Sequence, residues 1–426
     1  MRPEAHRRGF TLIEVLVGVA IGLIGCVIIF QVFAVNEGYK RSTASGSDAQ
    51  VAGALGIYAL ERELKMAGFG VNDRVAQGCT MLGYTSTRVP TSYSIALLPA
   101  QIHPGTGSNG EDILSISFGN PFEFAPGYGL SAANMAPGQN FQMENRGGVR
   151  RFDFLLAFQP GQANCSLLNA VSLPLDSPGP VQCAGANATD SVEICAGVAK
   201  TDADGVARIY NPAGGLTGAP TYTVQAGTAN TRYYDLGPEP AFNVYRIINN
   251  TLSLCNMRVS NCASTAAANW TPIMENVVFM KAQYGLDTND DGIVDTYDSR
   301  ICRDTTAYTA TAGDNFGSVW TTATDTNADG LVDTWSSGVP SAYDWSRVMA
   351  IRVAIVVRSS QFEKEDVTAA TLKLWPDATS NSGCTGAAAL TNAPSAGPTY
   401  AVPDRKYRYR AFETIVPLRN AIWLPD

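Results

Sequence analysis

An apolar run at the amino terminus constrains this chain more than any other feature. It covers residues 10–35, and residues 15–35 alone supply 21 positions, enough for an α-helix to cross a bilayer. The polar interruptions within it are Thr11, Glu14 and Gln31. The basic residues before it are Arg2, Arg7 and Arg8. Because positive charge stays on the cytoplasmic side, we expect a cytoplasmic amino terminus and a remainder across the membrane.

Glu14 is the residue in this run that requires an explanation. A secretory signal peptide would end in small residues at a cleavage site, whereas Asn-Glu-Gly-Tyr follows at residues 36–39. A plain signal anchor explains the charges and the span, but not a carboxylate that is costly to place in hydrocarbon. If the chain were cut after Gly9, a new α-amino group would appear on Phe10. Glu14 could then neutralise the same amine on a neighbouring subunit inside a shared apolar core.

The string Arg-Gly-Phe-Thr-Leu-Ile-Glu-Val at residues 8–15 closely resembles the type III signal of type IV pilins and pseudopilins. In that family a membrane peptidase cleaves after the glycine and methylates the new first residue. The resemblance therefore implies cleavage between Gly9 and Phe10, N-methylation of Phe10 and a role in assembly for Glu14. It covers roughly the first 25 to 30 residues and indicates the class of protein rather than the particular member.

The chain divides into four predicted segments. Residues 1–9 are a leader peptide, 10–36 a transmembrane and assembly helix, 37–68 its amphipathic continuation, and 69–426 a periplasmic or extracellular β-rich globular domain. Apolar residues at helical spacing support the continuation; they are Val51, Leu55, Tyr58, Ile57, Leu60 and Leu64. One helix over residues 12–66 would be roughly 80 Å long. An interrupted pair of helices is the alternative, because glycines recur within this stretch.

Runs typical of β-strands follow the helix. They cover residues 112–118, 152–158, 244–248, 251–254, 277–284, 348–357 and 407–416, and the third and fourth read as a hairpin around Asn249 and Asn250. We therefore predict an α+β, pilin-like fold, with a long N-terminal helix, transmembrane in its first half, packed on a large antiparallel sheet domain. Residues 212–231, 305–324 and 378–399 are rich in small and polar residues and predict long surface loops.

The composition argues against several functional classes. The formal net charge of −8 does not favour nucleic acid as a partner. The two histidines, His6 and His103, give little support to a histidine metal site or a nucleophile–histidine pair. The sequence also lacks a nucleophile elbow and a Gly-rich phosphate loop. We therefore expect a protein without enzymatic activity.

Nine cysteines suggest disulfides in an oxidising compartment. Cys26 lies in the apolar run and should serve there as a small apolar residue. The disulfide candidates are Cys79, Cys165, Cys183, Cys195, Cys255, Cys262, Cys302 and Cys384. Short separations favour Cys183–Cys195 and Cys255–Cys262, and the remaining pairings stay open.

Two acidic loops share the pattern D-T-N-x-D-G-x-V-D, which resembles the spacing of EF-hand calcium ligands. The first loop offers Asp287, Asn289, Asp291, the carbonyl of Ile293, Asp295 and Asp298. The second offers Asp325, Asn327, Asp329, the carbonyl of Leu331 and Asp333. Its twelfth position is Ser336 rather than a carboxylate, so the first loop is the better candidate for a structural calcium ion. The alternative is that both are ordinary turns, as we predict for the weaker echo at residues 202–205.

Scattered later segments resemble the PilW family of minor pilins. They are residues 59–64, 67–70, 275–285, 353–359 and 412–420, with Cys79 close to the second of them. The resemblance implies a minor pilin that primes type IV pilus assembly, lies at or near the pilus tip, and supports adhesion and twitching motility. The implied partners are other minor pilins, the major pilin, a large tip adhesin, the prepilin peptidase and the inner-membrane assembly platform. The chain would lie in the inner membrane before assembly and in the fibre afterwards. A minor pseudopilin of a type II secretion system is the alternative.

Overall fold

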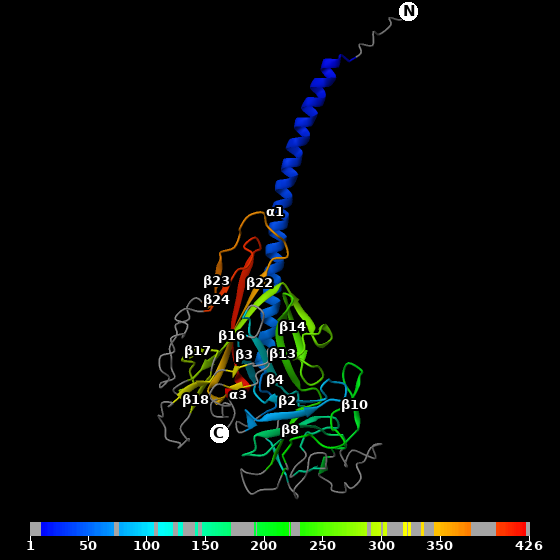
Figure 1. Ribbon diagram of the computed structural model, residues 1–426, viewed down its shortest axis with the longest axis vertical. Coiled ribbons are helices and arrows are strands. Elements are labelled where there is room, and N and C mark those ends of the chain that lie inside the picture. Colours follow the sequence, from blue (N-terminus) through cyan, green and yellow to red (C-terminus); the bar gives the residue numbers. More distant parts are fainter. Residues whose placement is uncertain are drawn as a thin grey trace, which may run out of the picture.

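A long helix projects from a β-rich body in the computed structural model of the chain (Figure 1). The structure describes residues 10–71, 76–105, 110–121, 127–130, 141–143, 147–171, 191–192, 194–220, 222, 231–287, 291–299, 301–304, 318–321, 323–324, 334–335, 345–375 and 398–422. The predicted α+β, pilin-like arrangement of an N-terminal helix and a large, mainly antiparallel sheet domain is confirmed.

Helix α1 (Leu12–Met66) is a single element of 55 residues, so the predicted continuous helix is confirmed and the interrupted pair is wrong. Thr11 caps its first turn, and the Lys65 ammonium lies 2.6 Å from the Glu61 carboxylate in its last turns. The helix ends where Gly68 adopts a φ of +80°, a conformation that favours glycine. The Gly68 N–H then donates to the carbonyl of Ser117, 2.8 Å away, and ties the helix end to strand β4 (Ile113–Phe118).

A six-stranded sheet lies at the end of the body farthest from the N-terminus of α1 (Figure 1). Its strands, in spatial order, are β2 (Ser92–Ala96), β1 (Thr80–Tyr84), β8 (Asn164–Asn169), β7 (Phe154–Phe158), β12 (Arg232–Gly237) and β5 (Tyr128–Gly129). β1 and β8 pair in parallel, whereas the other neighbours are antiparallel. The predicted strand over residues 152–158 corresponds to β7.

A five-stranded antiparallel sheet follows in the middle of the body. Its order is β15 (Thr271–Glu275), β14 (Thr251–Asn256), β13 (Ala241–Ile248), β4 (Ile113–Phe118) and β3 (Ala100–His103). Asn249 and Asn250 connect β13 to β14 with φ values of 50° and 61°. Two left-handed residues match the right-handed twist of the flanking strands. The predicted hairpin is therefore confirmed.

A four-stranded antiparallel sheet completes the large layers. Its order is β17 (Thr296–Asp298), β16 (Val277–Leu286), β22 (Val348–Arg358) and β25 (Tyr409–Pro417). β22 is an interior strand and is buried over most of its length, as its apolar sequence predicts. Its one charged interior residue, Arg352, is stacked between Tyr297 and Trp375, at 4.3 and 4.4 Å from their ring centres.

Several two-stranded sheets and short helices accompany these three sheets. The two-stranded pairs are β10 (Ala199–Thr201) with β11 (Ala207–Ile209), β18 (Ile301–Asp304) with β19 (Ser318–Thr321), β20 (Ala323–Thr324) with β21 (Thr334–Trp335), β23 (Thr371–Lys373) with β24 (Thr399–Ala401), and β6 (Phe141–Gln142) with β9 (Ser191–Val192). The short helices are η3 (Ala267–Asn269) and α3 (Arg419–Ile422). β19 and β20 fall within residues 305–324, so part of that predicted loop forms short strands. The Ser-Val-Trp-Thr sequence of β19 contains β-branched and aromatic residues, which suit a strand.

The second half of α1 packs against the body. Leu60 and Leu64 are fully buried in one cluster with Ile351, Val353 and Ile355 of β22. The helix contacts β25, β22, β15, β16 and β4, so it lies against both the four-stranded and the five-stranded sheets. A second cluster joins the five-stranded and six-stranded sheets through side chains such as Val244, Phe154 and Leu156. Among the described residues, α1 packs mainly on the four-stranded and five-stranded sheets, and the six-stranded sheet lies beyond them (Figure 1).

Candidate functional site

The amino-terminal end of α1 carries a hydrogen-bonded capping box. The Glu14 N–H donates to the Thr11 side chain over 3.4 Å. In return, Glu14 Oε2 accepts hydrogen bonds from the Thr11 N–H and the Thr11 hydroxyl, each 2.9 Å long. A carboxylate at this position also complements the positive end of the helix. Phe10 lies just outside the helix with 89% of its surface exposed, and Gly9 lies outside the described residues.

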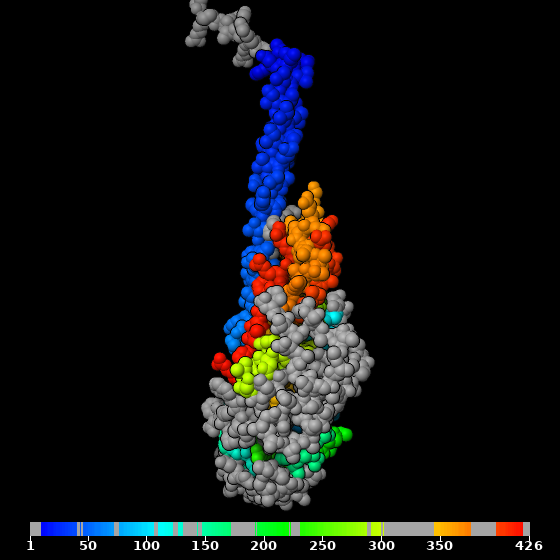
Figure 2. All heavy atoms as spheres, turned by 90° about the vertical axis from the view of Figure 1, so that its left-hand side faces the viewer, coloured from blue at the N-terminus to red at the C-terminus, as the bar shows by residue number. Residues whose placement is uncertain are grey.

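Among the residues that the structure describes, none covers the first half of α1. Figure 2 shows it standing clear of the body. Its large apolar side chains are all more than half exposed, from Phe10 through Val35. The segment Leu12–Lys40 is long and apolar enough to cross a membrane. Such an extended apolar surface must be covered by lipid or by protein.

A second uncovered apolar stripe lies on the part of α1 that runs along the body. Val51, Leu55 and Tyr58 are 55%, 51% and 62% exposed and lie on one helical face. The predicted apolar face is therefore divided, because Leu60 and Leu64 are buried in the body while this stripe faces outward.

The described residues of the first acidic loop, Asp287 and 291–295, lie between β16 and β17. The buried Asp287 carboxylate accepts the N–H groups of Asp291 and Gly292, at 3.3 and 2.7 Å. Gly292 has a φ of +82°, as the sixth position of a calcium loop requires. The Asp295 N–H donates to the carbonyl of Leu286 over 2.9 Å and closes the loop.

The structure describes only part of the predicted calcium ligands. Asp287, Asp291, Ile293, Asp295 and Asp298 are described, whereas Asn289 lies outside the described residues. The second loop lies outside them as well, including all of its candidates, which are Asp325, Asn327, Asp329, Leu331 and Asp333. Within the part of the chain that the structure describes, no three His, Cys, Asp or Glu residues are grouped to hold a metal ion. Calcium binding therefore stays a prediction.

The weaker acidic echo at residues 202–205 is a turn, as predicted. The Gly205 N–H donates to the carbonyl of Asp202 over 2.9 Å. Arg208 binds both carboxylates of this turn, with Nη1 2.8 Å from Asp202 Oδ2 and Nη2 2.6 Å from Asp204 Oδ2. These hydrogen bonds hold the pKa of Asp204 at about 2. The arginine thus occupies the oxygens that a cation would need.

Two disulfides are described. Cys255–Cys262 confirms the prediction from short spacing, whereas Cys79–Cys165 joins residues 86 positions apart. Cys195 is also disulfide-bonded, but Cys183 lies outside the described residues, so that pairing stays a prediction. Cys384 and the side chain of Cys302 also lie outside them. Cys26 is a free, exposed thiol in α1.

Comparisons with known families identify the class of this chain. The model of the prokaryotic N-terminal methylation motif matches residues 5–30, which contain the capping box and most of the exposed apolar helix. This match and the helix-and-sheet fold indicate a pilin-like protein with a prepilin signal. The model of the type IV pilus-assembly protein W matches residues 221–420, and the two matches together cover more than half of the chain. These two matches support a type IV minor pilin of the PilW family. No curated protein and no solved structure gave a match.

Proposed function

We propose that this protein is a minor pilin that primes type IV pilus assembly and sits at or near the pilus tip, where it supports adhesion and twitching motility. The observation that carries the proposal is the uncovered apolar helix, which begins at the Thr11–Glu14 box and bears a large PilW-matched domain at its other end. A helix of this kind is built to be covered by neighbouring subunits. A bulky domain is more easily accommodated at the end of a fibre than along its packed side.

The residues at the helix start suggest how the chain enters the fibre. Cleavage after Gly9 would place a new amine on Phe10, next to the N-cap residue Thr11. The Glu14 carboxylate, which accepts hydrogen bonds from Thr11 in the free chain, could then turn to the terminal amine of a neighbouring subunit. Pairing these charges removes the cost of burying either one alone in an apolar bundle.

The same features support a localisation. The chain would first lie in the inner membrane through the segment Leu12–Lys40, with its amino terminus cytoplasmic and its domain periplasmic. The assembly platform would then move it into the fibre, where the helices of the major pilin and of other minor pilins replace lipid. A large tip adhesin would contact the exposed body, and the prepilin peptidase would act earlier, at residues 9–10.

We also propose that the first acidic loop holds a structural calcium ion. Asp287, Asp291 and Asp295 would supply carboxylate oxygens, and Asp298 would close the site from β17. The inward carboxylate of Asp287 and the left-handed Gly292 support this assignment. The ion would fasten the β16–β17 connection to the four-stranded sheet and would take no part in catalysis.

Deletion in the source bacterium tests the assembly proposal against the pseudopilin alternative. Loss of sheared surface pili with normal type II secretion would support a minor pilin. Normal pili with lost secretion would overturn the proposal and favour a pseudopilin. The deletion strain should be complemented with the wild-type gene and with Glu14→Leu as a matched variant. The wild-type gene should restore pili, whereas Glu14→Leu should be processed but leave the strain without them.

A further inference from the structure

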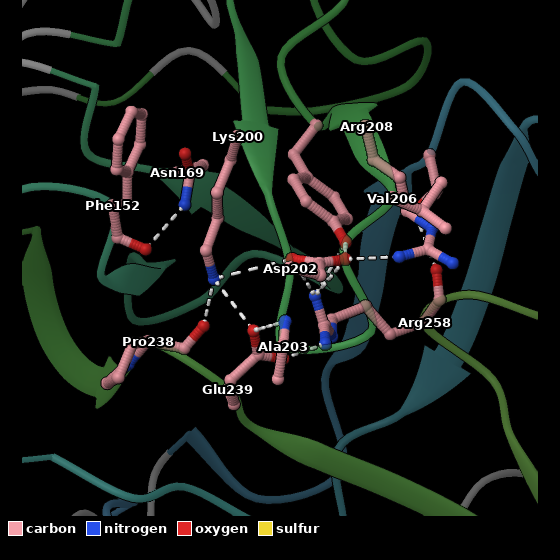
Figure 3. Close-up of polar contacts among 12 residues, drawn as sticks. Phe152, Asn169, Lys200, Asp202, Ala203, Val206, Arg208, Pro238, Glu239 and Arg258 are labelled. Carbon is pink, nitrogen blue, oxygen red and sulfur yellow. Dashed lines mark hydrogen bonds and ion pairs between the residues drawn. The ribbon is translucent and has the colours of Figure 1, made fainter.

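Three segments that are distant in the sequence meet at a buried ionic cluster (Figure 3). The β10–β11 hairpin supplies Lys200, Asp202 and Arg208, the segment after β12 supplies Glu239, and the loop after β14 supplies Arg258. Lys200, Asp202, Arg208 and Arg258 are each less than 9% exposed. We refer to these five residues as the Arg258 cluster. Buried charges are tolerated in proteins only where they are paired, so the pairing pattern decides what the cluster does.

Arg258 is the residue that joins the separate segments. Its Nη1 donates to the hydroxyl of Tyr210 over 2.6 Å and lies 3.4 Å from Asp202 Oδ1. Its Nη2 donates to the Glu239 carboxylate. The guanidinium carbon also lies 5.0 Å from the ring centre of Phe154 in β7. The planar guanidinium group of Arg258 therefore binds the hairpin on one side and the segment after β12 on the other.

Lys200 and Arg208 complete the pairing within the cluster. Lys200 Nζ donates to the carbonyl of Pro238 and lies 3.4 Å from Glu239 Oε1. Arg208 binds Asp202 and the adjacent Asp204. Three cationic side chains thus face three carboxylates. Removal of Arg258 would leave this balance short of one positive charge, with Asp202 still buried.

The backbone around Arg258 is fixed by a short disulfide loop. Cys255 and Cys262 are bonded to each other and are seven positions apart. Inside the loop, the Arg258 N–H donates to Asn256 Oδ1 over 3.0 Å. From outside the loop, Thr85 Oγ1 donates to the Arg258 carbonyl over 2.6 Å. The loop and Thr85 therefore hold the arginine backbone at its N–H and at its carbonyl, and the side chain contacts the hairpin.

The cluster lies where two parts of the chain are joined. Residues 31–220 lie between the two family matches, and they contain the hairpin and five strands of the six-stranded sheet. Glu239, Arg258 and the disulfide lie within the PilW-matched segment. The same joint includes a hydrogen bond of 3.0 Å from Arg88 Nε to the carbonyl of Ser260. These contacts make the cluster a connection between the matched and the intervening parts.

We propose that the Cys255–Cys262 loop and Arg258 form a latch that fastens the β10–β11 hairpin to the PilW-matched part of the domain. The disulfide closes the loop, the closed loop positions Arg258, and Arg258 holds the hairpin through Asp202 and Tyr210. Arg258 is therefore a positioning residue. Opening the disulfide should loosen the hairpin even though neither cysteine belongs to it. This inference does not depend on where the protein acts in the pilus.

Hydrogen exchange followed by mass spectrometry on the full-length protein in detergent tests the latch. The variants are Arg258→Met, which keeps most of the side-chain volume, and Cys255→Ser combined with Cys262→Ser. Both should raise the exchange rate of the hairpin amides, residues 199–209, at least ten-fold, while β22 exchanges as in the wild type. Combining all three substitutions should give no further increase, because the disulfide acts through Arg258. Arg408→Met is the matched control, because it removes a half-exposed arginine that lies 3.0 Å from Glu363, and it should leave the hairpin unchanged.

Two results would overturn the latch. Hairpin exchange at the wild-type rate in Arg258→Met would remove the arginine from the mechanism, and a protected hairpin in the double cysteine variant would remove the disulfide. If either change unfolds the whole domain, β22 will exchange rapidly as well. Tyr210→Phe then decides, since it removes the hydroxyl through which Arg258 holds the hairpin and leaves the disulfide intact. Faster exchange confined to the hairpin would support the latch, and an unchanged hairpin would contradict it.

Discussion

Glu14 caps α1 in the free chain, and in the proposed fibre the same carboxylate would meet a neighbouring subunit. In the free chain it accepts hydrogen bonds from Thr11 and caps α1, so the helix start is satisfied before any partner arrives. In a fibre the same oxygens could accept a hydrogen bond from a terminal amine. The sequence alone predicted a special role for Glu14, because a carboxylate in an apolar span is costly. The capping box could also have been found in the sequence, as a threonine three residues before a glutamate.

The first residue-scale prediction concerns Gly9. Replacing Gly9 with leucine should block processing, because a bulky side chain would stand next to the bond to be cut. Immunoblots should then show only the longer precursor, and pili should be absent. N-terminal sequencing is the decisive measurement. A mature chain that still begins at Phe10 in the variant would rule out the cleavage assignment.

A second residue-scale prediction concerns Asp235 in β12. Burial and the nearby Asp153 carboxylate raise the pKa of Asp235 to about 7. Because the folded state favours the neutral acid, its contribution to stability is present at pH 4 and is lost as the pH rises to about 7 and beyond. Asp235→Asn, which is neutral throughout, should therefore be more stable than the wild type at pH 8 by at least about 1 kcal/mol. The difference should vanish near pH 4.

Thermal unfolding of the two full-length proteins in detergent, measured from pH 4 to pH 8, checks this prediction. The amide oxygen of asparagine can still accept the Gly237 N–H, which lies 2.8 Å from Asp235 Oδ1, so the local turn is preserved. Parallel pH profiles for the variant and the wild type would show that Asp235 titrates normally in the folded state.

At the scale of elements, the contact between α1 and β25 depends on a missing side chain. A Cβ atom on Gly53 would lie 1.9 Å from the Phe412 ring, so the aromatic ring occupies the space that any other residue would need. Gly53→Ala should therefore lower the free energy of unfolding by about 1–3 kcal/mol through overpacking. At an open helix position, replacing glycine with alanine raises the free energy of unfolding by up to about 1 kcal/mol. The change expected at Gly53 therefore has the opposite sign.

Gly46 provides the matched control for that experiment. It lies in the same helix, and nothing is within 4 Å of a Cβ atom placed there, so Gly46→Ala should cause no loss of stability. Melting temperatures of both variants, with Gly53→Ala combined with Phe412→Leu as the rescue, are the measurements. Equal behaviour of the two alanine variants would show that α1 does not pack on β25 at Gly53.

A further element-scale prediction concerns the β16–β17 loop. Asp287→Ala combined with Asp291→Ala should lower the melting temperature of the full-length protein in calcium by several degrees more than in a chelator. Part of the loss should persist in both media, since Asp287 also accepts two backbone N–H groups of the turn. Calorimetry with and without calcium checks it. An identical loss in both media would mean that the loop is only a turn.

The elements that the sequence predicted correctly share a strong local signal. β22 is nearly all apolar, and the β13–β14 hairpin carries two asparagines at its turn. The β1 and β8 strands were not predicted, because their sequences mix small, polar and apolar residues without a clear period. Their parallel pairing also joins residues more than 80 positions apart, so Cys79–Cys165 could not be inferred from spacing.

On the scale of the whole molecule, the sequence predicted the N-terminal helix and the nearer sheets better than the contacts that join distant segments of the domain. The assembly helix and the strands of the nearer sheets follow from patterns within short windows. The Arg258 cluster does not, since Asp202 and Glu239 meet Arg258 only once three segments have folded together. The division of the apolar face of α1 into a buried and an exposed part does not follow from short sequence windows either. Periodicity places Val51, Leu55 and Leu64 on an apolar surface, but only the packed body shows which of them is left outside.

That outward stripe carries the last prediction, which concerns assembly of the whole molecule. Leu55→Arg should leave membrane insertion, processing and the stability of the domain unchanged, because Leu55 is half exposed in the free chain. Pilus number should nevertheless fall at least ten-fold, since a charge would then lie in a surface that other subunits are expected to cover. Gln50→Arg, at an exposed polar position of the same helix, should assemble normally. Counts of sheared pili from strains expressing each variant at equal level are the measurement, and normal pili with Leu55→Arg would show that the stripe stays in solvent in the fibre.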